Sequence, residues 1–367
     1  MKTTFRFIAF CITMAFYAPV ADASNWPVLP DKDGLAMIPA QQWKFKPGPR
    51  EVKVFVHYPG GRRENVKAKT GLMLSLHNWG GTGFIGTADP RTLADRYNVV
   101  VIGVNYLQSG RDWQKSGGPY DFGYLQALDA IRALYWVYEG LEKLKIPFDA
   151  GRIYAVGGSG GGNVTLMSNK LAPRTFACSI DISGMAKLSD DFAFGLPGGT
   201  KLDAGYSRDP QKPNYLSPDD QTIRCPGELG HLKTMKALGN SSKIIVIHGV
   251  DDASCPVSDA REMVANMKTA DLDVEPHFVT KADVNGKLFK NTGHSLADRT
   301  KVALHFGDEF ILSTSPKMKV RPGKCDFLCR DEKVQFETPN GRFVISYTKG
   351  YPVGRFEASV SAVQKKR

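Results

Sequence analysis

Apolar and polar residues follow two alternating patterns through the middle of the chain. Alternation over residues 52–58 predicts a half-exposed strand, and the unbroken apolar run 99–104 is typical of a strand buried on both faces. Apolar residues at helical spacing over 125–144 predict a helix that Pro147 ends. Strands separated by helices indicate βαβ units, so we predict an α/β fold with a mostly parallel central sheet flanked by helices. The same patterns recur for strands at 72–76, 152–156, 177–182, 243–247 and 274–280, and for helices at 163–171, 259–269 and 296–312.

Three segments depart from this alternation and divide the chain. Residues 24–50 are rich in proline and predict an N-terminal arm ahead of a main domain at 51–315. Within that domain, residues 185–240 form a long connection rich in Gly, Pro and Asp, and its length predicts a cap over a substrate pocket. Residues 316–367 follow as a C-terminal extension, in which turn residues at 339–341 between two apolar runs predict a β-hairpin.

The first 23 residues have the layout of a secretory signal peptide. Lys2 and Arg6 make a basic start, residues 7–20 are almost all apolar, and the triplet Ala-Asp-Ala at 21–23 gives an A-x-A cleavage site. The apolar stretch is shorter than the roughly 20 residues that an uncleaved membrane anchor needs. We therefore expect an exported protein, periplasmic or secreted, with no membrane span after cleavage.

Composition adds limits on partners and cofactors. The 367 residues carry 48 Lys and Arg against 37 Asp and Glu, a net charge of +11, and 42% are hydrophobic, which is typical of a globular protein and excludes a disordered or fibrous one. The excess charge is moderate and spread along the chain, so we expect no nucleic-acid partner. Cys325 and Cys329 are spaced either to close a small disulfide loop or to stay free. No metal or cofactor is expected, and the oligomeric state is left open.

The chemistry centres on Ser159. Residues 157–161 read Gly-Gly-Ser-Gly-Gly, a G-x-S-x-G motif between a predicted strand and a predicted helix. Small residues allow the tight turn that lifts the serine hydroxyl above the sheet, at a helix N-terminus whose dipole favours negative charge. A phosphate-binding loop is the alternative, but the Gly-Lys-Ser/Thr that it requires is absent. The motif therefore predicts Ser159 as a catalytic nucleophile.

A second glycine-rich loop follows the predicted strand at 72–76. Hydrolases with this kind of serine turn place half of an oxyanion hole in such a loop, and the backbone N–H after the nucleophile supplies the other half. We assign the two donors to Trp79 and Gly160, with Asn78 as the alternative in the loop. His77 precedes the nucleophile, which is the wrong order for a base, so we expect it to brace the loop.

The acid and the base of a triad are expected after Ser159, in that order. His294 lies in a loop just before the last predicted helix, from which a base can reach the serine. The loop after the strand at 243–247 offers Asp251 and Asp252 as acids, and we predict Asp252, with Asp251 as a turn or supporting residue. An acid there would hold His294 in the correct tautomer and stabilise its charged form. Asp181, at the end of the preceding strand, is a more distant alternative.

These motifs together resemble the α/β-hydrolase superfamily. A strand ending in His-Gly, followed by Asp252 and Pro256 and preceded by Asn-Tyr-Leu-Ser-Pro at 214–218, is similar to the catalytic domains of the prolyl oligopeptidase family. Secreted esterases of the polyhydroxybutyrate-depolymerase and feruloyl-esterase kinds are similar in size and layout. The resemblance covers about residues 50–312 and departs from the family in the oxyanion loop, which reads His-Asn-Trp-Gly-Gly.

The resemblance implies a serine hydrolase with a Ser-His-Asp triad. We expect carboxylic esters, small or polymer-linked, because the fewer than 50 residues before the predicted core leave no room for the β-propeller of full prolyl oligopeptidases. A peptidase of the prolyl oligopeptidase type that acts on short peptides is the alternative, and a non-catalytic binding protein on the same scaffold is a third possibility. Aromatic residues near the predicted catalytic loops are expected to line the substrate pocket. Those assigned are Trp113, Tyr120, Phe194 and Tyr206.

Overall fold

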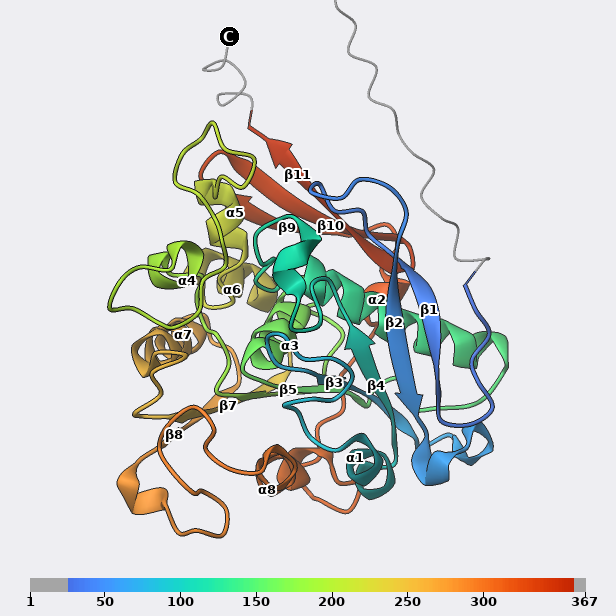
Figure 1. The fold of residues 1–367 in the computed structure, drawn as a ribbon. Coiled ribbons are helices and arrows are strands. Elements are labelled where there is room, and N and C mark those ends of the chain that lie inside the picture. Colours follow the sequence, from blue (N-terminus) through green and yellow to red (C-terminus); the bar gives the residue numbers. More distant parts are fainter. Residues whose placement is uncertain (1–25, 360–367) are drawn as a thin grey trace, which may run out of the picture.

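A computed structural model describes residues 26–359, so the predicted signal peptide at 1–23 lies outside the described residues. One sheet of eight strands has the order β1-β2-β4-β3-β5-β6-β7-β8 (Figure 1). Strands β3 to β8 are parallel, and β2 runs antiparallel to both of its neighbours. The mostly parallel sheet is therefore confirmed. The strands are β1 (Gly34–Ala40), β2 (Arg50–His57), β3 (Gly71–Leu76), β4 (Val99–Asn105), β5 (Ile153–Gly158), β6 (Cys178–Ile182), β7 (Lys243–Gly249) and β8 (Val274–Val279).

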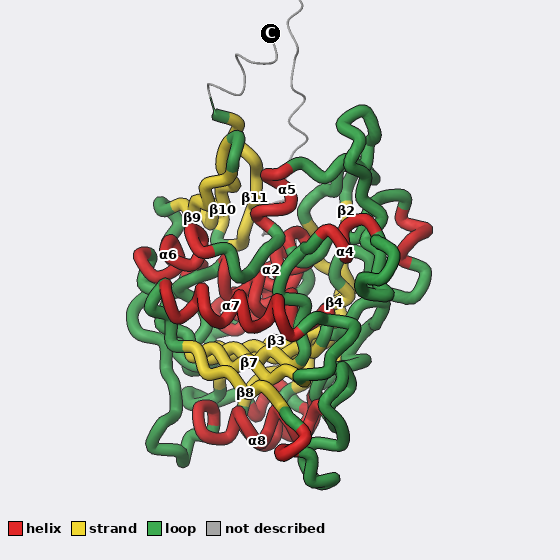
Figure 2. Tube along the Cα trace, turned by 90° about the vertical axis from the view of Figure 1, so that its left-hand side faces the viewer, coloured by secondary structure: helices red, strands yellow, loops and turns green. Residues whose placement is uncertain are grey.

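Helices cover both faces of this sheet, as Figures 1 and 2 show. Alternate residues of β4 enter two separate cores, Val100 and Ile102 on one face and Val101 on the other, because successive side chains of a strand point to opposite faces. This explains the unbroken apolar run that the sequence shows there. The helices on one face are α1 (Pro90–Tyr97) and α8 (Arg299–Ile311), and those on the other are α2 (Tyr124–Lys143), α3 (Gly160–Leu171) and α7 (Val257–Thr269).

Helix α1 was not predicted from the sequence pattern. It has eight residues, too few to show a repeated apolar spacing, and its limits are set by local signals. The Asp89 carboxylate accepts from the Thr92 N–H at the start, and Asn98 ends the helix in the left-handed conformation. Short 3-10 helices occupy connections at Pro59–Gly61, Arg63–Asn65, Trp113–Ser116, Lys281–Asp283 and Asp326–Leu328.

The segment expected as an N-terminal arm contributes to the main sheet. Residues 34–40 form β1, which pairs antiparallel with β2 along its whole length. Only Ile38 of this strand is buried, because β1 lies at the sheet edge, and Leu35 and Met37 stay exposed. A strand with one buried residue and a proline has no readable alternation, so the sequence pattern did not show that the predicted N-terminal arm contains an edge strand.

The long connection at 185–240 is not a separate cap. It contains α4 (Asp190–Phe194), α5 (Pro218–Ile223) and α6 (Leu229–Ala237). Its first half packs apolar residues against Tyr120 and Phe122 on the catalytic side. In its second half α6 packs against α7, and buried His231 hydrogen bonds to the Glu337 carbonyl at 2.7 Å. The second half therefore belongs to the helix layer, and His231 does not face a substrate pocket.

The C-terminal extension forms a second, smaller sheet in the order β11-β10-β9. It lies over α2, where the rings of Tyr124 and Phe343 meet at 5.1 Å, and β11 was not predicted. Cys325 and Cys329 are both free thiols on either side of a single helical turn, so the disulfide alternative is wrong. Among residues 26–359, no helix combines the length and apolarity that crossing a bilayer requires. The strands are β9 (Lys333–Thr338), β10 (Gly341–Lys349) and β11 (Tyr351–Ala358).

Candidate active site

Ser159 occupies the sharp turn between β5 and α3. Its backbone lies at φ 56° and ψ −122°, a conformation that costs on the order of 1–3 kcal/mol for a residue with a side chain. The turn forms because the two outer glycines of the motif touch each other: a Cβ on Gly157 would lie 2.2 Å from the Gly161 carbonyl oxygen. The Ser159 N–H donates to the Ile182 carbonyl at 2.9 Å and ties the turn to β6. The motif therefore has the strand–turn–helix context that a nucleophile elbow requires.

Three side chains from distant parts of the sequence meet at this turn. Oγ of Ser159 lies 2.9 Å from Nε2 of His294, and Nδ1 of His294 lies 2.8 Å from Oδ2 of Asp252. Ser159 follows β5, Asp252 follows β7, and His294 lies in the loop before α8. Because the strands are parallel, these loops meet at one edge of the sheet. The serine hydroxyl can donate to the imidazole, whose other N–H donates to the carboxylate, as nucleophile activation by a general base requires. The structure thus brings together the three side chains assigned from sequence.

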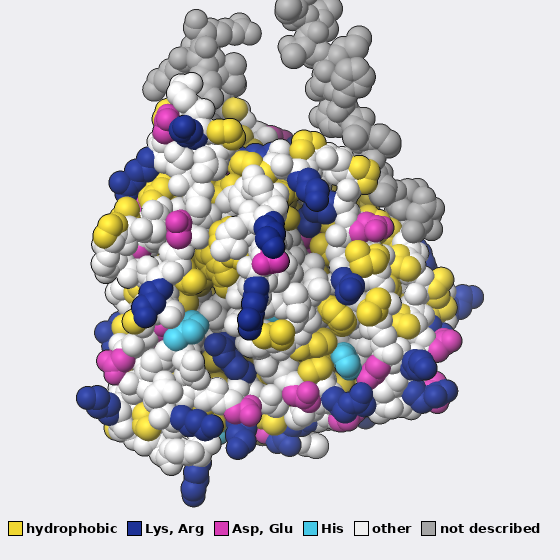
Figure 3. Space-filling model, in the orientation of Figure 1, with side chains coloured by type: hydrophobic (Ala, Val, Ile, Leu, Met, Phe, Trp, Pro, Cys, Tyr) yellow, Lys and Arg dark blue, Asp and Glu magenta, His cyan; other side chains and the backbone are white. Residues whose placement is uncertain are grey.

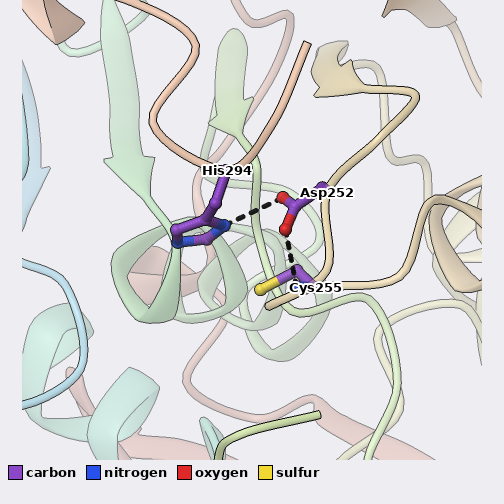
Figure 4. A group of neighbouring side chains, drawn as sticks. All are labelled: Asp252, Cys255 and His294. Carbon is purple, nitrogen blue, oxygen red and sulfur yellow. Dashed lines mark hydrogen bonds and ion pairs between the residues drawn. The ribbon is translucent and has the colours of Figure 1, made fainter. Parts of the chain in front are cut away.

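Asp252 is held as a carboxylate. Burial alone would raise its pKa, but hydrogen bonds from His294 and from the Cys255 N–H outweigh burial and hold the pKa of Asp252 below its usual range. Figure 4 shows these two contacts on opposite oxygens of the carboxylate. His248 braces the same loop by donating to the Cys255 carbonyl at 2.8 Å. A charged carboxylate beside Nδ1 stabilises the imidazolium that forms when His294 takes the serine proton.

The neighbouring Asp251 has a different partner. Its Oδ2 accepts a hydrogen bond from the Thr292 hydroxyl at 2.6 Å, and its N–H donates to the Thr292 carbonyl at 2.9 Å. These bonds tie the loop of the acid to the loop of the histidine, two residues before His294. Asp251 therefore supports the site, as expected, and Asp252 faces the imidazole.

The backbones of Gly160 and Trp79 are in contact beside the serine. A Cβ on Gly160 would lie 2.6 Å from the Trp79 nitrogen and 3.1 Å from its Cα. Gly160 is the first residue of α3, and the first N–H groups of a helix have no partner within it. The N–H of Asn78, the alternative donor, is already used, because it donates to the Ile85 carbonyl at 3.1 Å. These contacts favour Trp79 and Gly160 as the two donors.

His77 braces this loop, as expected. It is fully buried, hydrogen bonds to the Asn78 carbonyl at 2.8 Å and stacks on the Tyr106 ring at 4.0 Å. Burial lowers the pKa of His77 to about 4, so the imidazole is neutral at physiological pH. Nε2 of His77 also hydrogen bonds to the Ser109 hydroxyl at 2.7 Å, so a neutral ring with two hydrogen bonds holds the loop without adding charge to it.

We predict that Gly160→Ala lowers kcat by about 10²- to 10³-fold, the usual loss for one oxyanion donor. The new methyl group must displace the Trp79 backbone, because the two atoms would otherwise lie 2.6 Å apart. Steady-state kinetics and the thermal midpoint of each protein measure the effect. A suitable control is Gly230→Ala on α6, where the added Cβ meets only the flexible end of Glu228 at 3.1 Å. Equal kcat in the Gly160→Ala and Gly230→Ala proteins would contradict the assignment.

Aromatic side chains form a platform next to the oxyanion loop. Trp79 stacks on Tyr120 with ring centroids 3.7 Å apart and an interplanar angle of 7°, and Trp113 meets Trp79 edge-on at 5.6 Å. Trp79 and Trp113 are half-buried and offer ring surface to a ligand. Tyr120 is fully buried beneath Trp79, so its predicted direct contact with substrate is wrong, and it supports the platform instead.

Phe194 and Tyr206 pack against the apolar cluster that contains Tyr120, but each also has a partner of its own. The guanidinium of Arg208 lies 4.5 Å from the centre of the Phe194 ring. Tyr206 lines a pocket of about 290 Å³ together with Arg224, and no residue of the triad lines that pocket. A contact of either side chain with substrate stays a prediction.

Two buried groups lie at the site: Cys255, which the sequence analysis missed, and Asp181, which it considered only as a distant alternative for the acid. Cys255 is 1% exposed, and its thiol lies beside Ser159. Asp181 is fully buried at the end of β6, where a Cβ on Gly162 or Gly184 would lie 2.1 Å from its Oδ1. Neither position carries a motif, although each adjoins one in the folded chain. One ligand atom from each of Asp252, Cys255 and His294 lies within 4.8 Å of the others, so these residues could hold a metal ion.

Asp181 makes stability depend on pH. Burial raises the pKa of Asp181 to about 7 from its ordinary 3.8, so between these values the folded chain holds a proton that the unfolded chain releases. Stability therefore falls as pH rises through this range, and the loss is complete above the folded-state pKa. An asparagine at this position does not titrate, so Asp181→Asn should lack this pH dependence. We predict that the free energy of unfolding of the variant, minus that of wild type, is larger at pH 8 than at pH 5 by on the order of 1–4 kcal/mol. Urea unfolding of both proteins at the two pH values measures this, and a pH-independent difference would contradict it.

The face seen in Figure 3 carries scattered charges. Lys and Arg side chains alternate there with acidic and apolar ones and do not merge into one continuous basic area. On this face the basic side chains are therefore dispersed, in keeping with the spread of charge along the sequence.

Comparison with known proteins gives a family and a fold. The model of the prolyl oligopeptidase family, Peptidase_S9, matches residues 98–306, more than half of the chain. No curated protein matches. Among solved structures, the chain is similar to the acylaminoacyl peptidase of Pyrococcus horikoshii, with 17% identity, a TM-score of 0.54 and coverage of 78% of this chain and 43% of that one.

A puromycin-hydrolyzing peptidase of Mycobacterium tuberculosis is similar at 16% identity and a TM-score of 0.50, with coverage of 78% of this chain and 42% of that one. The chain thus spans less than half the length of these proteins, and at such identities the likeness shows the α/β-hydrolase fold. The family match and the fold agree with the geometry of the serine turn. The chain belongs to the prolyl oligopeptidase family of serine hydrolases.

Proposed function

We propose that this serine hydrolase is a peptidase that cleaves short peptides through an acyl-enzyme. The observation that carries the proposal is the hydrogen-bonded chain from Ser159 through His294 to Asp252 in a member of the prolyl oligopeptidase family. The sequence pattern alone favoured carboxylic esters. The family match and the similar structures, an acylaminoacyl peptidase and a puromycin-hydrolyzing peptidase, support the peptide alternative better.

In the proposed mechanism, Oγ of Ser159 attacks the scissile carbonyl while Nε2 of His294 takes the hydroxyl proton. The N–H groups of Gly160 and Trp79 would stabilise the oxyanion, each contributing about 2.7–4 kcal/mol. His294 then gives its proton to the leaving amine, which departs and leaves an ester of Ser159. Water, deprotonated by His294, attacks that ester and releases the acid.

A peptidase depends more than an esterase does on the proton that His294 gives to the leaving group. An amine is a poor leaving group unless it is protonated, whereas an alcohol or phenol leaves more readily. The pair of Asp252 and His294 keeps the imidazolium stabilised until the amine departs. Cleavage of an amide is therefore the demanding test, and cleavage of an ester is not.

The experiment compares a peptidyl p-nitroanilide with a p-nitrophenyl ester and labels the protein with a fluorophosphonate. We expect labelling at Ser159, and hydrolysis of both substrates that is lost in Ser159→Ala. Hydrolysis of the ester alone would favour the carboxylic esterase instead. A folded protein that resists labelling and hydrolyses neither substrate would support the non-catalytic binding protein.

We also propose that the enzyme acts after export. The support is the signal-peptide layout of residues 1–23. Expression of the full chain in a secreting bacterial host, followed by N-terminal mass spectrometry of the exported protein, tests it. A mature N-terminus at Ser24 is expected, and an intact Met1 in the cytoplasmic fraction would contradict it.

A further inference from the structure

A buried thiol lies against the proposed catalytic side chains. Cys255 follows Asp252 by three residues and is 1% exposed. Its Sγ lies on the side of the acid loop that faces His294 (Figure 4). One ligand atom from each of Asp252, Cys255 and His294 lies within 4.8 Å of the other two. The proposed mechanism gives this thiol no task.

The three donors match one class of cation. A carboxylate oxygen, an imidazole nitrogen and a thiolate sulfur are the ligand types that Zn²⁺ uses in proteins, and a tetrahedral site with three protein ligands leaves one position for another oxygen. Oγ of Ser159 lies 2.9 Å from Nε2 of His294, so an ion bound to that nitrogen would lie next to the proposed nucleophile. Mg²⁺ and Ca²⁺ prefer sites made of oxygen alone. The set therefore selects a borderline-soft cation over the abundant hard ones.

The charges around the thiol favour a cation. The charged groups close enough to interact electrostatically with the Cys255 thiol are the carboxylates of Asp252 and Asp181 and the guanidinium of Arg299. The Asp181 oxygens accept no hydrogen bond from another side chain within the described residues. The His294 side chain is 25% exposed, which gives a small ion a route from solvent. Above the pKa of Asp181 of about 7, where this carboxyl is ionised, a divalent ion entering here would meet more negative than positive charge.

We infer that Asp252, Cys255 and His294 form an inhibitory site for Zn²⁺. The inference rests on the proposed function, because two of its ligands are the proposed acid and base. On binding, the thiol proton leaves to solvent, and bonds form from zinc to sulfur, to a carboxylate oxygen and to one imidazole nitrogen, with no change of oxidation state. Zinc on Nε2 occupies the lone pair that would accept the Ser159 proton. Zinc on Nδ1 shifts the imidazole proton onto Nε2, so in either case His294 no longer acts as a base.

The first arm of the test measures inhibition. Each protein is compared with its own rate without zinc, using the substrate that it hydrolyses. We expect Zn²⁺ to suppress turnover of wild type and a chelator to restore it, whereas Mg²⁺ at the same concentration does not inhibit. Cys255→Val removes one of the three ligands, so it should raise the zinc concentration for half-inhibition by more than the roughly 10- to 100-fold that loss of an outer-shell partner costs. Cys225→Val is the control, because Cys225 is a free thiol outside the group of three possible ligands, and it should keep the wild-type sensitivity.

The second arm measures binding without any need for turnover. The full-length Ser159→Ala protein is titrated with Zn²⁺ by calorimetry, and one ion per chain is expected. The Ser159→Ala/Cys255→Val protein should lose that binding while keeping its thermal midpoint. If the Ser159→Ala protein binds zinc but the wild-type protein hydrolyses no substrate, the proposed function is contradicted and the zinc site is supported. Equal inhibition of wild type and Cys255→Val, or no loss of binding in the double variant, would overturn the zinc site.

Discussion

Replacing Ser159 by alanine is expected to lower kcat by about 10⁴- to 10⁶-fold while leaving the protein folded. The hydroxyl is the group that lies 2.9 Å from Nε2 of His294, and no other described hydroxyl makes that contact. Steady-state hydrolysis and fluorophosphonate labelling measure the loss. Full activity in the alanine variant would mean that another residue attacks the substrate.

The strain at this position gives the experiment an internal control. Ser159 has φ 56°, which glycine adopts freely and alanine does not. Both Ser159→Ala and Ser159→Gly should be inactive, but Ser159→Gly should have the higher thermal midpoint, because it relieves on the order of 1–3 kcal/mol of backbone strain. Equal midpoints would show that the turn is not strained in solution.

Asp252→Asn is expected to lower kcat by about 10⁴-fold. An amide at this position can donate to Nδ1, which places the imidazole proton on Nε2 and removes the acceptor for the Ser159 hydroxyl. The same change also removes the negative charge that stabilises the imidazolium. Hydrolysis rates and labelling rates measure both consequences, with the substrate held fixed.

The adjacent Asp251→Asn variant is the matched control. Asp251 accepts from the Thr292 hydroxyl at 2.6 Å, and an asparagine oxygen can still accept that bond. We expect a small loss of kcat and a small loss of stability from this change. Losses of equal size in the two variants would mean that the acid has been assigned to the wrong residue.

Several elements were predictable because their causes are local. The apolar run at β4 predicted a strand buried on both faces, and the helical spacing at 125–144 predicted α2 to within one residue at each end. The serine turn was recognisable because glycine is needed wherever two backbones come closer than a Cβ allows, as at Gly157 and Gly161. Asp252 and His294 could be assigned because each follows or precedes a predictable element in the chain order of known hydrolases.

Elements at the edges were not predictable. β1 buries one residue, Ile38, and therefore lacks the alternation that marks a half-buried strand. Tyr120 is the kind of aromatic residue that lines substrate pockets, but it is buried beneath Trp79 and supports the platform instead. The positions of β1 and Tyr120 depend on which surfaces pack together, and no local pattern encodes that.

Chain order and local pattern were thus enough to predict the sheet class, the elbow and the identity of the three proposed catalytic side chains. Only the packing of distant segments decided the rest: that Asp252 faces His294 while Asp251 faces Thr292, and that the Trp79 backbone lies beside Gly160 while the Asn78 N–H is bonded to the Ile85 carbonyl. The same packing buries Cys255 and Asp181 against the triad. The physical reason is the separation, along the sequence, of the residues that interact. Strand and helix patterns arise between residues a few positions apart, whereas hydrogen bonds and burial at the site join residues up to 135 positions apart.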